Sequence, residues 1–139
     1  MAIIDMQTMR YINLFERISH VRATKCFVYN NVIYFAVPPR FFSRASENYG
    51  YAAKIISEQL GKRVRIIKDA NEDLTSVSRF IQAVVSPADF ESLESHEGIY
   101  LIIAGSRERA ATLIGRNKVR LNELNSITES YFGKQVKIV

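Results

Sequence analysis

Gly61-Lys62-Arg63-Val64-Arg65-Ile66-Ile67 recurs near the end of the chain as Gly133-Lys134-Gln135-Val136-Lys137-Ile138-Val139. In both copies a glycine precedes a run of alternating β-branched and polar residues, which is typical of a turn followed by a strand. A duplicated segment of this kind indicates that the chain is built from a repeated structural unit.

Two further matches occur upstream, in the same order. Residues 33–37 (Ile-Tyr-Phe-Ala-Val) correspond to residues 99–103 (Ile-Tyr-Leu-Ile-Ile), and residues 10–12 (Arg-Tyr-Ile) to residues 79–81 (Arg-Phe-Ile). The three spacings are 72, 66 and 69 residues, so they agree within small insertions. We therefore expect two domains, residues 1–70 and residues 71–139, joined by the short polar segment 68–73.

Hydrophobic periodicity predicts the elements of the first domain. The apolar residues of segment 11–18 fall on one helical face. The aromatic and β-branched runs 25–29 and 32–37 predict a hairpin around Asn30-Asn31, because Asn tolerates the positive φ of a tight turn. A further helix that includes residues 52–60 and a strand at residues 64–67 complete the domain.

The second domain repeats this order. Its predicted elements are a helix at 77–85, hairpin strands at 90–94 and 99–103, a short helix at 107–114, a longer helix that includes 121–131, and a strand at 136–139. We expect both domains to share the order helix, strand, strand, helix, helix, strand, which places the chain in the mixed α/β (α+β) class.

Composition limits the classes of function that the chain can have. The 139 residues are 47% hydrophobic and 24% charged, as in a folded domain, and 19 Lys and Arg against 14 Asp and Glu leave a net charge of +5. This excess favours polyanionic partners. The chain has no apolar run long enough for a membrane helix and no secretory signal, so we expect a cytoplasmic protein without a membrane partner. A single cysteine excludes an internal disulfide and a cysteine-rich zinc site.

The most informative segment is the junction between the two helices expected in the second half of the second domain. Residues 106–120 carry a net charge of +4, from one glutamate and five basic residues: Arg107, Arg109, Arg116, Lys118 and Arg120. Gly115 within this segment lets another backbone approach closely. The uncapped amides at the start of the following helix favour an anion, so a phosphate backbone is the expected ligand.

Other interpretations remain for these residues. A basic run at a helix end is most often a solvated face, and a single glycine often occupies a turn that has no binding role. The sequence has no nucleophile elbow, phosphate-binding P-loop or dinucleotide fingerprint. We therefore expect no enzymatic activity, no catalytic residue, no metal, no cofactor and no small-molecule substrate.

The junction and the module order resemble a known family. Ile114 followed by Gly115-Arg116-Asn117-Lys118, between two helices and before a closing strand, resembles the KH domain, whose Gly-x-x-Gly loop holds nucleic-acid backbone. The order with a leading helix and a closing strand resembles the type II KH arrangement, which implies a three-stranded mixed sheet covered by helices. The tandem pair, with Arg10-Tyr11-Ile12-Asn13-Leu14-Phe15-Glu16 near the start, resembles the archaeal-type NusA family of transcription factors over nearly the whole chain.

The sequence departs from the family's loop motif twice. In the second domain Lys118 replaces the closing glycine and keeps the positive charge. In the first domain the corresponding segment is Glu47-Asn48-Tyr49-Gly50, where Glu47 replaces the opening glycine and places a carboxylate against an approaching phosphate, a charge that Arg44 offsets. In this segment we expect a loop, with Tyr49 positioned to stack on a base.

The resemblance implies RNA contacts at both loops. The RNA-binding residues that it implies are Gly115, Arg116, Asn117, Lys118, Arg120, Ile114, Arg107 and Arg109 in the second domain, and Asn48, Tyr49, Gly50 and Arg44 in the first. Ile114, Val119 and the strand at 99–103 would form the floor of a groove for unstacked bases.

The implied function is that of a non-enzymatic transcription factor that binds single-stranded nascent RNA during elongation or termination. RNA polymerase is the other partner that the resemblance allows. Two alternatives use the same fold: a protein-interaction module of the transcription machinery that has lost RNA affinity, and an RNA-processing or ribosome-associated KH protein.

Overall fold

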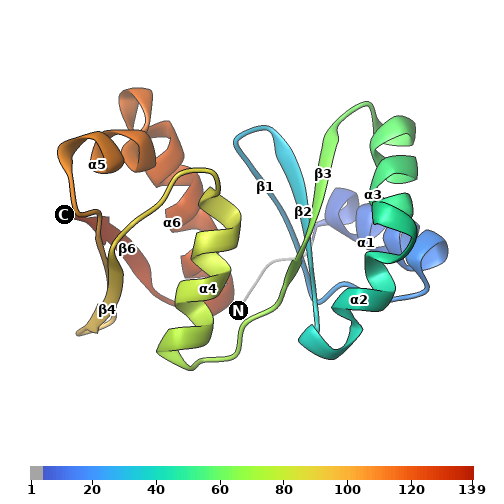
Figure 1. The fold of residues 1–139 in the computed structure, drawn as a ribbon, viewed down its shortest axis with the longest axis horizontal. Coiled ribbons are helices and arrows are strands. Elements are labelled where there is room, and N and C mark those ends of the chain that lie inside the picture. The colour runs from blue at the N-terminus through green and yellow to red at the C-terminus, as the bar shows by residue number, and fades with distance from the viewer. Residues whose placement is uncertain (1–4) are drawn as a thin grey trace. The chain divides into compact units, whose positions relative to one another are not determined.

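The computed structural model describes residues 5–139, with the side chains of residues 48 and 49 left out. The described chain divides into two compact units, residues 5–69 and residues 70–139. The first unit contains α1 (Met6–Ser19), β1 (Lys25–Tyr29), β2 (Val32–Val37), the 3-10 helix η1 (Pro39–Phe41), α2 (Phe42–Ala45), α3 (Glu47–Leu60) and β3 (Arg63–Lys68). The second contains α4 (Leu74–Val85), β4 (Ser92–His96), β5 (Ile99–Ile103), α5 (Arg107–Ile114), the 3-10 helix η2 (Arg116–Lys118), α6 (Val119–Phe132) and β6 (Gln135–Ile138). Each unit is drawn in Figure 1.

The first unit begins with a capped helix. Asp5 is the N-cap of α1, and its Oδ1 accepts a hydrogen bond from the backbone N–H of Thr8 at 2.7 Å. That hydrogen bond also lowers the pKa of the Asp5 carboxyl, because it stabilises the charged form. The helix ends at His20, which adopts the left-handed conformation with φ 63°.

The sheet of the first unit is mixed. β1 and β2 form an antiparallel hairpin, and Asn30 and Asn31 at its turn have φ values of 50° and 62°, as the sequence predicts. β3 pairs with β2 in parallel, so β2 is the central strand. All six residues of β2 are buried.

Helices α1 and α3 cover one face of this sheet (Figure 1). The rings of Phe15 on α1 and Phe35 on β2 stack with their centroids 4.5 Å apart, and Ile56 on α3 is fully buried in the same core. On the opposite face, Phe27 stacks on Tyr34 at 5.3 Å. Burial of aromatic and β-branched side chains on the helix-covered face is the main term that stabilises the unit.

The second unit has the same order of strands and the same pairing directions. β4 and β5 are antiparallel, and β6 joins β5 in parallel. α4 contributes Phe80 to the core, where its ring meets the Phe132 ring of α6 edge to face at 5.4 Å. Tyr100 and Ile102 of β5 are buried beside them.

The predicted bounds of one hairpin strand and of its turn were wrong. The expected strand at 90–94 and turn at 95–98 are replaced by β4 at Ser92–His96 and a two-residue turn at Glu97 and Gly98, with φ values of 45° and 81°. Ser95 and His96 continue the strand because they pair with Tyr100 and Ile99. Otherwise the fold class is confirmed: the protein is mixed α+β, with two three-stranded mixed sheets and helices.

Candidate nucleic-acid interface

The predicted junction is a sharp corner between two helices. α5 ends at Ile114, η2 makes a single 3-10 turn, and α6 begins at Val119. The N–H of Gly115 donates to the carbonyl of Ala111 at 2.9 Å, and the N–H of Lys118 donates to the carbonyl of Gly115 at 3.2 Å. The corner is therefore held by backbone hydrogen bonds at both ends.

Gly115 is the residue at which the corner packs closely against Arg120. Its φ and ψ of 76° and 170° lie in a region that residues with a Cβ rarely adopt. A Cβ placed there would lie 2.7 Å from Cγ of Arg120 and 3.1 Å from its backbone nitrogen. The corner therefore needs glycine both for its backbone angles and for the space beneath the Arg120 side chain.

The next residues also have left-handed backbone. Asn117 has φ 55° and ψ 28°, and Lys118 has φ 61° and ψ 23°. This conformation costs a non-glycine residue of order 1 kcal/mol, less for Asn, and such strain is concentrated at binding and catalytic sites. The strained pair turns the exposed side chains of residues 116–118 outward from the corner.

The exposed corner is basic. Arg116 and Lys118 are exposed, and within residues 5–139 neither has an ion-pair partner. Arg120 is different, because its Nη1 lies 2.6 Å from Oε1 of Glu123 one turn along α6. From the sequence alone, Arg120 counts as a free positive charge. In the structure, its ion pair with Glu123 offsets much of that charge.

Two more of the predicted cations lie on α5. Arg107 and Arg109 are exposed in its first turn, where Ser106 caps the helix by accepting from the Arg109 N–H at 3.2 Å. The pKa of the Asp89 carboxyl is lowered, mainly by a hydrogen bond from Gln82, and the nearby charge of Arg109 adds to this effect. Arg107 is therefore the less compensated of the two cations.

The apolar residues of the proposed groove are only partly accessible. Val119 is 43% exposed and Ile114 is half-buried, whereas the adjacent Leu113 is fully buried in the core. On β5, Tyr100 and Ile102 are buried, and the side chains of residues 99, 101 and 103 alternate with them.

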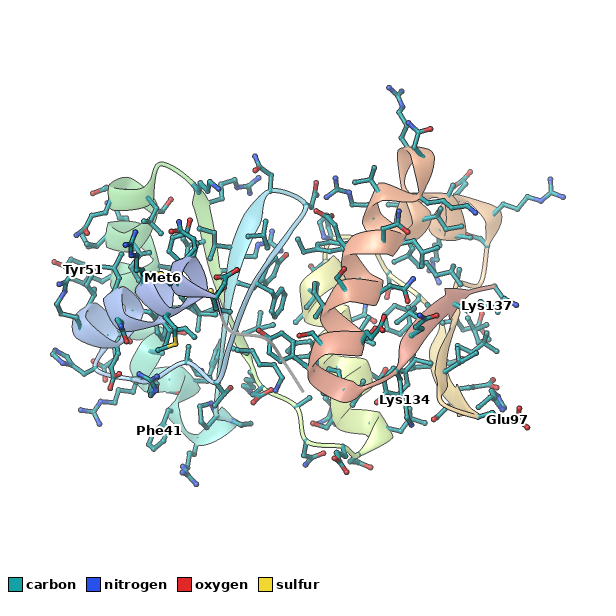
Figure 2. The ribbon with its side chains drawn as sticks, turned by 180° about the vertical axis from the view of Figure 1, so that it is seen from behind. Met6, Phe41, Tyr51, Glu97, Lys134 and Lys137 are labelled. Carbon is teal, nitrogen blue, oxygen red and sulfur yellow. The ribbon has the colours of Figure 1, made fainter. Side chains whose placement is uncertain are left out.

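Strand β6 was missed as a part of this region. Helices α5 and α6 both contact β6, which is one of the two edge strands of the sheet. The N–H of Val136 donates to Oδ1 of Asn125 on α6 at 2.6 Å, and Lys137 on the same strand is exposed (Figure 2). Only the three-dimensional pairing of β6 with β5 puts these groups beside the corner helices, so the sequence held no local signal for them.

The corresponding segment of the first unit is not an open loop, and this prediction was wrong. Residues 47–50 form the first turn of α3, and the Gly50 N–H donates to the carbonyl of Ser46 at 3.2 Å. Helix formation wins because Glu47 is favourable in a first turn, where its charge meets the positive end of the helix.

One feature of the predicted loop nevertheless remains in the first unit. Gly50 has φ 79°, so the last position of the tetrapeptide is left-handed there as it is at Lys118. The expected roles of the Asn48 and Tyr49 side chains lie outside the described part of the chain.

Arg44 lines a pocket that the sequence did not predict. It is the exposed last basic residue of α2, and it lines a pocket formed with α1 and with the connection between α1 and β1. Since the other lining residues come from segments away from residues 47–50, the structure gives Arg44 a second surrounding that the loop prediction did not include.

Within residues 5–139, no helix is both long and apolar enough to cross a lipid bilayer. The same residues hold no group of three or more His, Cys, Asp or Glu side chains placed to bind a metal ion.

Comparison with known proteins bears on the fold. No protein-family model matches the chain, and no curated protein matches it either. Among solved structures, the crystal structure of a protein called APE1850 is similar, with a TM-score of 0.68 and 26% sequence identity. The similarity covers 98% of this chain and 100% of that chain, so it extends through both units.

Proposed function

We propose that this protein binds single-stranded RNA through tandem KH-like modules and acts on nascent transcripts, as the resemblance to the archaeal-type NusA family suggests. Two features support the KH assignment. Each unit has the order helix, strand, strand, helix, helix, strand. In each unit the closing strand pairs in parallel with the second strand of the hairpin, as the type II arrangement requires.

The observation that carries the proposal is the corner at residues 115–118. A glycine fixed beneath Arg120 and a left-handed Asn117–Lys118 pair hold two exposed cations on one rigid turn. Rigid presentation matters, because a preorganised contact loses less conformational entropy when the ligand binds. The corner therefore suits a ligand with regularly spaced negative charges.

In this proposal the contacts divide by chemistry. Arg116 and Lys118 bind successive phosphates and set the position of the strand without reading its sequence. The exposed Val119 and the half-buried Ile114 contact unstacked bases beside the corner. No covalent step is involved, so the protein acts by binding alone.

The test is a fluorescence-anisotropy titration of a labelled single-stranded RNA at several salt concentrations. Replacing Arg116 and Lys118 together by Ala removes two phosphate contacts. The slope of log affinity against log salt should become shallower by about 1.4, at roughly 0.7 per contact on single strands. Circular dichroism should show an unchanged fold, because both side chains are exposed.

The matched control removes the same charge elsewhere. Arg10 and Arg17 are exposed on α1 and, within residues 5–139, form no ion pair. The Arg10→Ala, Arg17→Ala variant should keep the salt slope of the unmodified protein. Equal losses in both double variants would mean that net charge alone attracts RNA, and the corner would lose its assigned role.

A further inference from the structure

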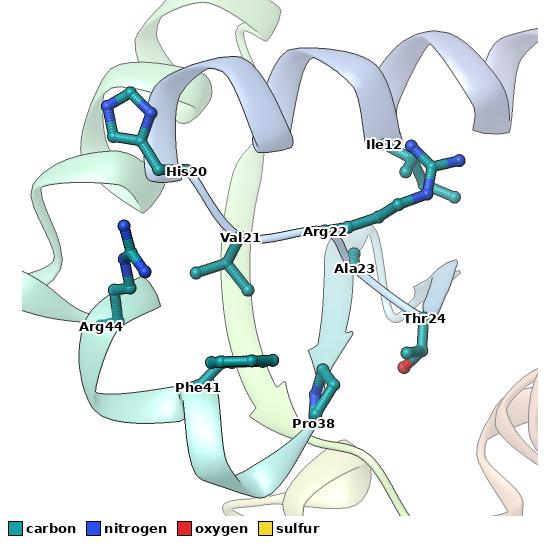
Figure 3. Close-up of a pocket in the computed structure, with 9 residues that line it drawn as sticks. All are labelled: Ile12, His20, Val21, Arg22, Ala23, Thr24, Pro38, Phe41 and Arg44. Atoms are coloured by element: carbon teal, nitrogen blue, oxygen red, sulfur yellow. The ribbon is translucent and has the colours of Figure 1, made fainter.

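A pocket lies wholly within the first unit, away from the corner just described. Its volume is about 520 Å³, which is in the range of pockets that bind a side chain or a small ligand. The pocket lies between the end of α1, the connection from α1 to β1, and the η1–α2 segment (Figure 3). It is lined by Ile12, His20, Val21, Arg22, Ala23, Thr24, Pro38, Phe41 and Arg44.

The floor of this pocket is apolar. Ile12, Val21 and Ala23 are buried, and Phe41, which is 36% exposed as a residue, forms a side wall (Figure 3). An exposed aromatic ring beside a concave apolar floor is the usual arrangement for anchoring a partner's side chain.

Several polar groups near the floor already have partners. The hydroxyl of Ser19 bonds both the N–H and the carbonyl of Val21, and the N–H of Thr24 donates to the carbonyl of Ala36 at 2.8 Å. The Thr24 hydroxyl lies 2.7 Å from Oδ2 of Asp69. A nucleobase that reached this part of the floor would find these groups already bonded, whereas an apolar side chain needs no hydrogen-bond partner there.

The rim of the pocket is basic. His20 and Arg44 stand on one side and Arg22 on the other (Figure 3). Arg22 is paired with Glu16 at 2.8 Å, whereas Arg44 has no ion-pair partner within residues 5–139. The guanidinium of Arg40 lies 4.8 Å from the centre of the Phe41 ring, so another cation lies beside this wall of the pocket. An occupant that carries carboxylates beside an apolar group complements this distribution.

We propose that the pocket binds a short acidic segment of a partner protein. One apolar side chain of that segment, a leucine or a phenylalanine, enters between Val21 and Phe41, and a neighbouring carboxylate meets Arg44. This interaction does not depend on RNA binding at the second unit, so either proposal can fail without the other.

The probes are short synthetic peptides rich in Asp and Glu, with a central Leu, Phe or Ala. Each is titrated into the isotopically labelled full chain and followed by NMR. The Leu and Phe peptides should shift the amide signals of Val21, Ala23 and Phe41, and the Ala peptide should bind about tenfold more weakly. A peptide with Lys in place of its acids should not bind.

Two variants and two controls locate the contact. Phe41→Ala and Arg44→Glu should each weaken the Leu peptide about tenfold, and neither should unfold the chain because both side chains are exposed. Tyr51→Ala and Lys54→Glu, at exposed positions on α3, should leave its affinity within about twofold. Figure 2 shows Phe41 and Tyr51 as separate surface side chains.

Three outcomes would overturn the proposal. The first is that no apolar-centred acidic peptide shifts the pocket amides. The second is that Arg44→Glu binds the peptide as tightly as the unmodified protein does. The third is that single-stranded RNA shifts these amides while the peptides do not, which would make the pocket an RNA site.

Discussion

Gly115 and Arg120 are packed so closely that the glycine lies directly beneath the aliphatic part of the arginine side chain. A Cβ on residue 115 would lie 2.7 Å from Cγ and 3.0 Å from Cβ of Arg120. The guanidinium of the same arginine is held by Glu123 at 2.6 Å. Arg120 thus packs against the corner and stabilises it, whereas Arg116 and Lys118 are exposed to solvent.

Gly115→Ala should therefore destabilise the protein by about 1–3 kcal/mol, because it combines backbone strain with a contact at 3.1 Å to the backbone nitrogen of Arg120, which cannot move aside easily. Urea denaturation measures the loss. Gly133→Ala is the control: its φ of 70° is similar, but a Cβ there meets nothing within 4 Å, so about 1 kcal/mol of strain is expected. Equal losses in the two variants would contradict the close-packing explanation.

Lys118→Gly should raise the stability of the protein while lowering its affinity for RNA. Glycine adopts φ 61° without strain, so the variant should gain stability of order 1 kcal/mol at this position, although glycine's greater freedom in the unfolded chain offsets part of it. RNA affinity should fall nonetheless, because one exposed positive charge is lost. Thermal unfolding and anisotropy on the same sample measure both quantities.

Asn117→Gly is the matched comparison for that variant. Asn tolerates the left-handed conformation, so its φ of 55° stores less strain and the stability gain should be smaller. The charge is unchanged, and the salt dependence of RNA binding should stay as it is. A larger gain at Asn117 than at Lys118 would show that strain is not distributed as the backbone angles indicate.

Glu123→Gln should strengthen RNA binding. The Glu123 carboxylate neutralises Arg120 beside the corner, so its removal leaves a fuller positive charge there. We expect an affinity gain of about two- to tenfold at low salt that shrinks as salt is raised. Anisotropy titrations at two ionic strengths would detect it.

Glu129→Gln provides the equal change in net charge at the other end of α6, where the side chain is exposed. This variant should leave RNA affinity nearly unchanged, because its charge lies outside the first turns of the helix. If both variants tightened binding equally, the effect would come from net charge, and the local role of Glu123 would be wrong.

The fold could be predicted from the sequence because its local signals agree with one another. Asn30 and Asn31 mark a turn that needs positive φ, and both residues have it. The glycines that open the two repeated segments, Gly61 and Gly133, end their helices in the left-handed conformation. Where periodicity and turn chemistry point the same way, element type is well determined.

One of the two errors in the predicted elements came from tertiary pairing. Ser95 and His96 are ordinary turn residues by composition, and only their partners on β5 make them part of a strand. The segment at Glu47 was predicted as a loop by analogy with the second unit, yet helix formation extends through it. Short segments near an element's end depend on contacts that periodicity does not report.

The candidate interface was only partly predictable, because the pairing of its charged side chains depends on three-dimensional contacts. A basic run shows which charges are present, but the pairing of Arg120 with Glu123 depends on helical geometry. The spacing of three residues between them was visible in the sequence and could have indicated this pair. The surroundings of Arg44 had no comparable signal, because most residues that line the pocket with it come from residues 12–24, a segment distant in the sequence.

Cys26 lies on β1 and is 4% exposed in the core with Phe15 and Ile33. Burial raises the pKa of its thiol to about 12, and the negative charge of Asp5 adds to that effect. Since the thiolate is the reactive form, a thiol reagent should react slowly with the folded protein at pH 8 and rapidly after denaturation.

The same shift makes stability depend on alkaline pH. Above pH 9 the unfolded chain loses the thiol proton while the folded protein keeps it, so the unfolded state binds fewer protons and stability falls as pH rises toward 12. The slope from this one group approaches about 1.4 kcal/mol per pH unit. Burial also raises the pKa of Tyr34, which adds a fall in the same direction. Urea titrations at pH 8 and pH 10 should therefore show a smaller loss of unfolding free energy between the two pH values in Cys26→Val than in the unmodified protein, because valine cannot ionise. An identical loss in the two proteins would mean that the buried thiol ionises with little penalty in the folded state.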